Sequence, residues 1–126
     1  MTANLCLDTG ALIAIERGDG RVRAAIDAAR RDGHEVYVPA GAIAQAWRGG
    51  SGRQVELARF LKRGQHHEVD LDAGSARAVG ELCSRVGVAD VVDAHVALVA
   101  RLHDARVVTS DPDDIARFPG IRIIGI

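Results

Sequence analysis

Short apolar runs alternate with longer stretches in which apolar residues recur at helical spacing along the whole chain. Apolar runs bounded by turn residues are typical of strands, and the periodic stretches are typical of amphipathic helices. Strands are predicted at residues 4–7, 35–38, 67–71, 106–109 and 121–126. Helices are predicted from 11 to a stop near 18, from 19 or 20 to 33, and at 43–47, 55–64, 76–86 and 90–103, with a short one opening at 111–114. This alternation favours an α/β fold with a mostly parallel sheet and right-handed crossovers.

The length and composition of the chain predict a single domain, residues 1–126, with an aliphatic core. Hydrophobic residues make up 48% of the chain but aromatic residues only 3%, which suits helices packed on a buried sheet. The net charge of −1 gives no strong field for nucleic acid, so binding a polyanion would need a local basic patch or metal ions. No apolar run is long enough to span a bilayer and no export signal is visible, so a cytoplasmic protein with buried free thiols at Cys6 and Cys83 is expected.

Several classes of site lack their sequence signatures. Neither GxGxxG nor GxxxxGK[ST] occurs, which argues against a nucleotide-binding Rossmann domain and a P-loop enzyme. No G-x-S-x-G elbow or Cys–His pairing supports a serine or cysteine nucleophile. Among the histidines, His66 and His67 enter a predicted strand and are expected to be exposed, and His95 is expected to be packed or to face solvent rather than to act in a site.

Aspartates follow two predicted strands and open a predicted helix. Asp8 ends the first strand, Asp111 follows the strand at 106–109, and Asp90 and Asp93 are three apart on one helix face among apolar neighbours. Each acid alone could cap a helix. Because ligands bind beyond the carboxyl ends of parallel strands, convergence of these acids on a cation is favoured over independent caps.

Oxygen ligands from several aspartates suit Mg²⁺, with Mn²⁺ as a second possibility. Such ions commonly act on phosphoryl groups, where one ion activates water and a second stabilises the leaving oxygen.

Four segments in order resemble the PIN-domain family, and within it the VapC-like ribonuclease toxins of type II toxin–antitoxin systems. They are residues 7–14 (LDTGALIA), 38–49 (VPAGAIAQAWRG), 90–97 (DVVDAHVA) and 107–114 (VVTSDPDD). The resemblance covers nearly the whole chain. It implies a PIN-like (Rossmann-like) three-layer sandwich with helices flanking a mostly parallel central sheet.

The resemblance also implies roles for single residues. Asp8 matches the family's first acid, Asp93 the third and Asp111 the fourth position, so these three would hold the metal. Asp90 would complete the catalytic set, while Asp114 is an additional acid and Thr109 resembles the hydroxyl residue that orients the site.

One position departs from the family pattern. Gln45 stands where the second acid is usual, and its amide brings no charge, which predicts weak metal affinity. Glu16 is the nearest candidate to supply the missing charge, but about 12 Å of helix rise separates it from Asp8, so direct ligation beside Asp8 is not expected.

The activity that the resemblance implies is Mg²⁺-dependent endoribonucleolytic cleavage of RNA phosphodiester bonds by a homodimer that a small cognate antitoxin neutralises. Arg17, Arg48 and Arg53 are candidates to contact RNA phosphates, although each could equally lie on a solvated helix face.

An inactive PIN domain kept as a protein-interaction module is the alternative, supported by Gln45. A metal-dependent phosphatase or receiver-like domain is disfavoured, because no acidic pair follows the first strand and no phosphate-binding Lys is evident.

Overall fold

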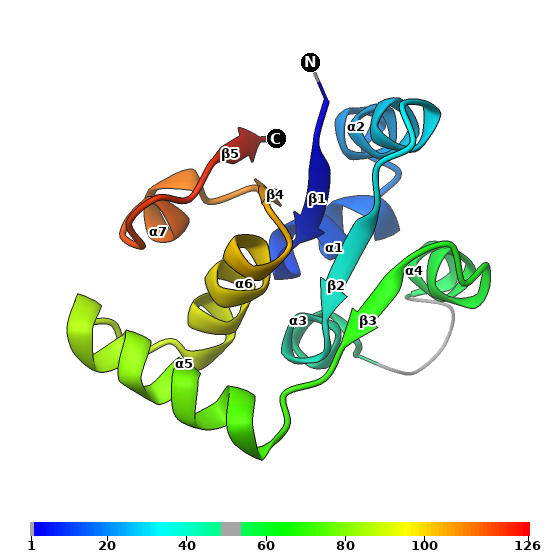
Figure 1. The fold of residues 1–126 in the computed structure, drawn as a ribbon. Helices are drawn as coiled ribbons and strands as arrows, with labels where there is room; N and C mark the ends of the chain where they lie inside the picture. Colours follow the sequence, from blue (N-terminus) through cyan, green and yellow to red (C-terminus); the bar gives the residue numbers. More distant parts are fainter. Residues whose placement is uncertain (1, 49–53) are drawn as a thin grey trace.

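The computed structural model describes residues 2–48 and 54–126, and its centre is a parallel sheet of five strands (Figure 1). The strands are β1 (Asn4–Leu7), β2 (Val36–Pro39), β3 (His67–Val69), β4 (Ala105–Thr109) and β5 (Ile123–Gly125). Their spatial order is β3-β2-β1-β4-β5, and every neighbouring pair is parallel. The helices are α1 (Thr9–Glu16), α2 (Gly20–Arg31), α3 (Ala40–Ala46), α4 (Val55–Lys62), α5 (Ala73–Val86), α6 (Val91–Leu102) and α7 (Pro112–Ala116).

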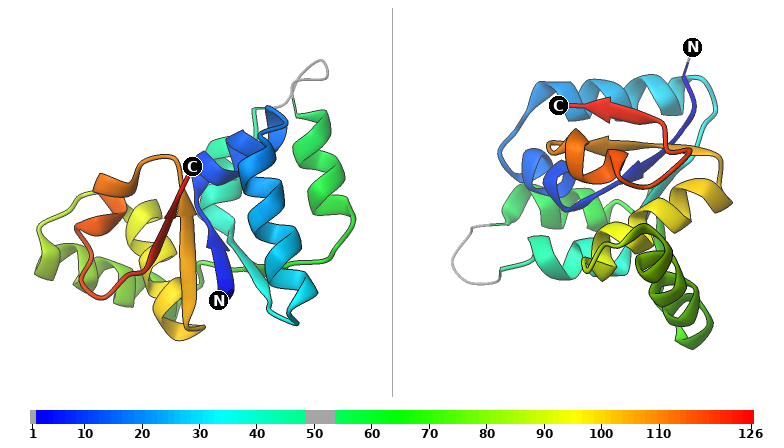
Figure 2. Two further views of the ribbon diagram at one scale, coloured as in Figure 1. Left: turned by 90° about the horizontal axis from the view of Figure 1, so that it is seen from above. Right: turned by 90° about the vertical axis from the view of Figure 1, so that its left-hand side faces the viewer.

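The helices form two layers because side chains alternate between the two faces of β1. Leu5 and Leu7 join a core with buried residues of α1, α2, α3 and α4, whereas Cys6 packs with Val96 of α6 on the other face. α5 lies outside α6 and packs against it through Val79 and its neighbours. Figure 2 shows α1 and α2 on one side of the sheet and α5 and α6 on the other. The predicted three-layer α/β sandwich is confirmed.

The element boundaries shift by a few residues from those predicted. α3 starts directly after Pro39, and α5 starts at Ala73 because the Asp72 carboxylate accepts a hydrogen bond from the Ser75 amide at 2.8 Å. The edge strands β3 and β5 are each three residues long. The predicted turn at 49–52 lies outside the described residues. None of the described helices has the length and apolar character that crossing a membrane would require.

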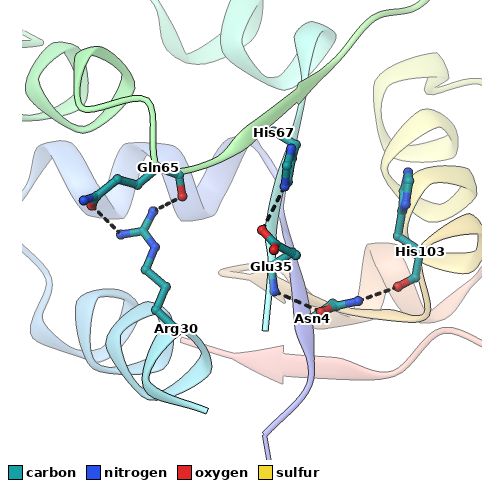
Figure 3. A network of polar contacts seen from close by, with 6 residues as sticks. All are labelled: Asn4, Arg30, Glu35, Gln65, His67 and His103. Carbon is teal, nitrogen blue, oxygen red and sulfur yellow. Dashed lines mark hydrogen bonds and ion pairs between the residues drawn. The ribbon is translucent and has the colours of Figure 1, made fainter. Parts of the chain in front are cut away.

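A polar network ties together the amino ends of the strands (Figure 3). Asn4, which opens β1, donates from Nδ2 to the carbonyl oxygen of His103 at 2.9 Å and accepts from the Glu35 amide at 2.9 Å. His67, which opens β3, pairs with the Glu35 carboxylate at 2.8 Å. The Tyr37 ring stacks on both His67 and His103. These contacts help to align the starts of the strands. They lie at the amino ends of the strands, opposite to the carboxyl ends.

The histidine and cysteine predictions are met in part. The prediction that His66 is exposed is wrong: its side chain is 1% exposed because the Phe60 ring of α4 stacks on it with centroids 5.2 Å apart. His67 is exposed as predicted, and His95 is packed in the interior. Cys6 is buried and free, whereas Cys83 is free but only partly buried.

The sheet order determines where the candidate site lies. The chain builds β1, β2 and β3 outward in one direction and then returns to place β4 on the other side of β1. A parallel α/β sheet opens a crevice at the carboxyl ends of the two strands where this order reverses. Here those strands are β1 and β4, which pair with Leu7 opposite Val108. Asp8 and Asp111 follow these two strand ends.

Candidate active site

Asp8 is fixed by both the sheet and the helix that follows it. Its amide donates to the Val108 carbonyl oxygen at 3.3 Å, and its Oδ1 accepts from the Ala11 amide at 2.9 Å as the N-cap of α1. The residue is buried. Burial raises the pKa of its carboxyl group, and the nearby Asp111 raises it further, while hydrogen bonds from Thr109 and from backbone amides oppose this.

Asp90 and Asp93 reach the same edge from the start of α6. Asp90 is the N-cap of α6, and its Oδ1 accepts from the amides of Val92 and Asp93 at 3.0 Å each. Asp93 itself is partly buried, and burial raises its pKa to about 6, with further increases from the charges of Asp90, Asp8 and Asp114. This electrostatic coupling shows that the fold brings acids from separate segments close together.

Thr109 links the acids that follow β1 and β4. Its buried hydroxyl oxygen accepts from the Asp111 amide at 2.9 Å, and its side chain is hydrogen-bonded to Asp8. Asp111 is the N-cap of α7 but makes no side-chain capping bond. Its carboxyl group instead shares a hydrogen bond with Asp114, which together with the charge of Asp111 raises the pKa of Asp114.

We call these five side chains the acidic cluster: Asp8, Asp90, Asp93, Asp111 and Asp114. The capping alternative therefore holds for Asp8 and Asp90 without excluding a place in the cluster, because both cap helices that start at the crevice. It does not account for Asp111, whose carboxylate caps nothing.

Gln45 contacts the residue that follows Asp8, because the Thr9 hydroxyl group donates to the Gln45 Oε1 at 2.7 Å. Thr9 was not singled out in the sequence, although its place directly after Asp8 was visible there. Glu16 does not reach the cluster. Its Oε2 accepts from the amides of Glu56 and Leu57 at 2.9 and 3.3 Å, so this carboxylate caps the start of α4, where Gln54 provides no side-chain cap.

Two of the three arginines predicted to contact RNA lie near each other in the structure. Arg17 and Arg48 are both exposed and line a hollow of about 380 Å³ together with Ile13, Ala46 and other residues. Arg53 lies outside the described residues. Sequence reasoning missed Arg117, whose Nη2 is 3.6 Å from the Asp114 Oδ1 and whose charge lowers the pKa of Asp93. Its only sequence signal is the three-residue spacing from Asp114 in a short helix.

The chemistry of the acidic cluster fits a hard divalent cation. Within residues 2–48 and 54–126, no three or more His, Cys, Asp or Glu side chains are arranged as a ready-made metal cage. Within the cluster, however, the charges of neighbouring acids contribute to the raised pKa values of Asp8, Asp93 and Asp114, as expected of carboxylates that lie close together. Carboxylate oxygens are the donors that Mg²⁺ and Mn²⁺ prefer.

Comparison with solved structures agrees with this fold. VapBC2 from Rickettsia felis, in a structure bound to a DNA fragment from its promoter, matches with a TM-score of 0.75 and 17% identity over 96% of this chain and 97% of that one. A toxin–antitoxin complex from Klebsiella pneumoniae matches with a TM-score of 0.73 and 17% identity over 96% of each chain. FitAcB from Neisseria gonorrhoeae matches with a TM-score of 0.60 and 19% identity over 95% and 96%.

Comparison at the level of sequence gives one positive result. A search of curated proteins found no relative of this chain. The family model of the PIN domain, in contrast, matches residues 5–121, which include most of β1 and Asp8 as well as β4 and the helix that follows it. The chain therefore belongs to the PIN domain family.

Proposed function

We propose that this PIN domain is a metal-dependent endoribonuclease, the toxin of a type II toxin–antitoxin pair, and that the whole chain, residues 1–126, works as one domain in the cytoplasm. The observation that carries the proposal is that Asp8, at the end of β1, is electrostatically coupled both to Asp111, past the end of β4, and to Asp93, near the start of α6. The Asp8 amide is bonded to the Val108 carbonyl oxygen and the Asp111 amide to the Thr109 hydroxyl group, so these two acids start from the paired ends of β1 and β4. Carboxylates from three separate chain segments at this place suit phosphoryl chemistry that depends on Mg²⁺ or Mn²⁺.

In this proposal Asp8, Asp93 and Asp111 hold the cation, with Asp90 beside them. When bound, the cation would polarise the phosphodiester and activate water for its hydrolysis. Thr109 positions Asp8 and Asp111 relative to each other, because its buried side chain is hydrogen-bonded to both residues. The capping bonds of Asp8 and Asp90 restrict the rotation of both carboxylates, so less conformational entropy is lost when a cation binds.

The uneven charge of the chain supports a polyanionic substrate. Residues 17–63 contain ten Arg and Lys residues and five Asp and Glu residues, whereas the rest of the chain contains six and twelve. The near-neutral net charge of the chain therefore includes a basic segment, residues 17–63. Arg17, Arg48 and Arg53 belong to this segment, and we assign them to contacts with RNA phosphates.

The proposed partners are a cognate antitoxin and a second copy of the chain. The antitoxin assignment rests on similarity to chains from toxin–antitoxin complexes. The homodimer assignment rests on the resemblance to the VapC-like toxins, and the described part of the chain leaves some large apolar side chains exposed, including Leu102 at 72%. Light scattering at micromolar concentration tests it, and a monomeric mass with full activity would contradict it.

An inactive PIN domain that only binds protein partners is the second candidate, because Gln45 places a neutral amide beside Asp8. Incubation of total RNA with the protein, with Mg²⁺ or with EDTA, separates the two candidates when Asp93→Asn is the control. Cleavage that requires the metal and is lost in Asp93→Asn is expected. Intact RNA with the wild-type protein, combined with no heat of Mn²⁺ binding in calorimetry, would favour the binding module.

A further inference from the structure

Arg117 places a positive charge at the rim of the acidic cluster. Its Nη2 is 3.6 Å from the Asp114 Oδ1, and its Nε donates to the backbone carbonyl oxygen of Asp114 at 3.2 Å. These two contacts hold the guanidinium group against α7. Its charge also acts on Asp93, at the start of α6. The side chain is 47% exposed, so it remains accessible to a ligand.

The fold does not need this arginine for stability. An exposed ion pair between residues three apart contributes little, typically a few tenths of a kcal/mol. The segment containing α7 is instead anchored by Ile115 and Phe118, each of which is only 1% exposed. A cation at this place also competes with a metal ion for the same carboxylates. Arg117 adds little to the stability of the fold and would oppose cation binding at the acidic cluster. Its position therefore points to a role toward the substrate.

On the basis of the proposed nuclease function, we propose that Arg117 binds the phosphodiester at the acidic cluster and stabilises the negative charge that develops on it during hydrolysis. In this reaction a water oxygen forms a bond to phosphorus, the bond from phosphorus to the leaving sugar oxygen breaks, and that oxygen takes up a proton from the water. The non-bridging oxygens gain negative charge on the way, and a guanidinium group can donate two parallel hydrogen bonds to them.

The charge of the cluster explains why such a residue is needed. Five carboxylates gathered at one edge repel the phosphates of RNA, and a single divalent cation offsets only part of this charge. Arg117 supplies a further positive charge from the protein itself. Its Nε contact to the Asp114 carbonyl oxygen orients the guanidinium in advance, so less conformational entropy is lost on binding the substrate.

The role predicts opposite effects on substrate and metal. Replacing Arg117 by Gln removes a charge that favours RNA but repels a divalent cation. We expect kcat/KM for cleavage to fall about a hundredfold, as for the loss of one preorganised donor at a transition state. We expect Mn²⁺ affinity without RNA to stay the same or to tighten about threefold, because the removed charge is solvent-screened.

Arg122 provides a matched control. It is 49% exposed and pairs with an aspartate, Asp104, through Nη2 at 2.6 Å, but Asp104 precedes β4 and so lies at the opposite edge of the sheet. The experiment compares the wild type with Arg117→Gln, Arg117→Lys and Arg122→Gln. Steady-state cleavage of a mixed-sequence single-stranded RNA gives kcat and KM, calorimetry gives Mn²⁺ affinity, and circular dichroism checks that each variant is folded.

The outcomes are separable. A loss of kcat/KM in Arg117→Gln with retained Mn²⁺ affinity, partial rescue in Arg117→Lys and no effect in Arg122→Gln supports the inference. Wild-type kinetics in Arg117→Gln overturn it while leaving the proposed function standing. Loss of cleavage together with weaker Mn²⁺ binding also overturns it, because Arg117 would then only position the carboxylates. No cleavage by the wild type overturns the proposed function and the inference with it.

Discussion

The raised pKa of Asp93 leads to a prediction about stability that needs no substrate. Asn at this position keeps the size and the oxygen acceptor of the side chain but removes the charge. In the metal-free protein the ionised Asp93 is unfavourable, since burial and its acidic neighbours raise its pKa from 3.8 to about 6. Asp93→Asn should therefore be more stable than the wild type at neutral pH.

The shift sets the magnitude of this effect and its direction with pH. At 1.36 kcal/mol per pKa unit, the upper bound is about 3 kcal/mol, and screening at this partly exposed carboxyl group reduces it to about 1 kcal/mol. The folded wild type holds the proton more tightly than the unfolded chain. The contribution of Asp93 to the free energy of unfolding is therefore most favourable below pH 3.8. It falls as the pH rises to about 6 and is constant above that. The gain in the free energy of unfolding of Asp93→Asn over the wild type should therefore be small below pH 3.8, grow up to about pH 6 and stay constant above that.

Urea unfolding in EDTA at pH 4.5, 5.5, 6.5 and 7.5 measures this difference directly. Asp70→Asn is the control, because Asp70 is exposed in the loop between β3 and α5 and should show no such trend. Adding Mn²⁺ at pH 7.5 should stabilise the wild type more than Asp93→Asn, because the cation binds the folded cluster. A stability loss in Asp93→Asn that is equal at every pH would refute the electrostatic reasoning and point to a purely structural role.

Three further substitutions test the site and the contacts around it. Gln45→Glu restores an acid beside Asp8 and should tighten Mn²⁺ binding about tenfold in calorimetry; unchanged affinity would show that Gln45 is outside the metal site. Glu16→Ala removes the carboxylate that caps α4 and should lower the free energy of unfolding by about 1–2 kcal/mol, whereas equal stability would mean that solvent caps this helix as well. Gly10→Ala would put a methyl group 2.1 Å from the Ser110 Oγ and should cost about 1–3 kcal/mol in urea unfolding. Adding Ser110→Gly should recover part of that loss, and no recovery would locate the clash elsewhere.

Local patterns in the sequence determined the elements and the candidate acids. Apolar runs and helical periodicity depend on neighbouring residues, so they located the strands and helices with errors of a few residues at the ends. The positions of Asp8 and Asp111 directly after strands are equally local, because parallel strands carry their ligands at their carboxyl ends. The spacing of Asp90 and Asp93 within one helical turn is local as well.

Tertiary structure alone decided which of these residues meet. Asp8 and Asp111 come together because β4 pairs with β1 rather than with β3, which is a choice of strand order and not of local pattern. Glu16 is engaged with α4 because α1 and α4 share one face of the sheet, and the ring of Phe60 buries His66 from the same side. Arg117 gains its place beside the acidic cluster only once α7 packs at the end of β4. Apart from the ion pair of Arg117 with Asp114, which is three residues before it, these contacts join different elements. The periodicity of side chains along the chain does not say which elements pack together.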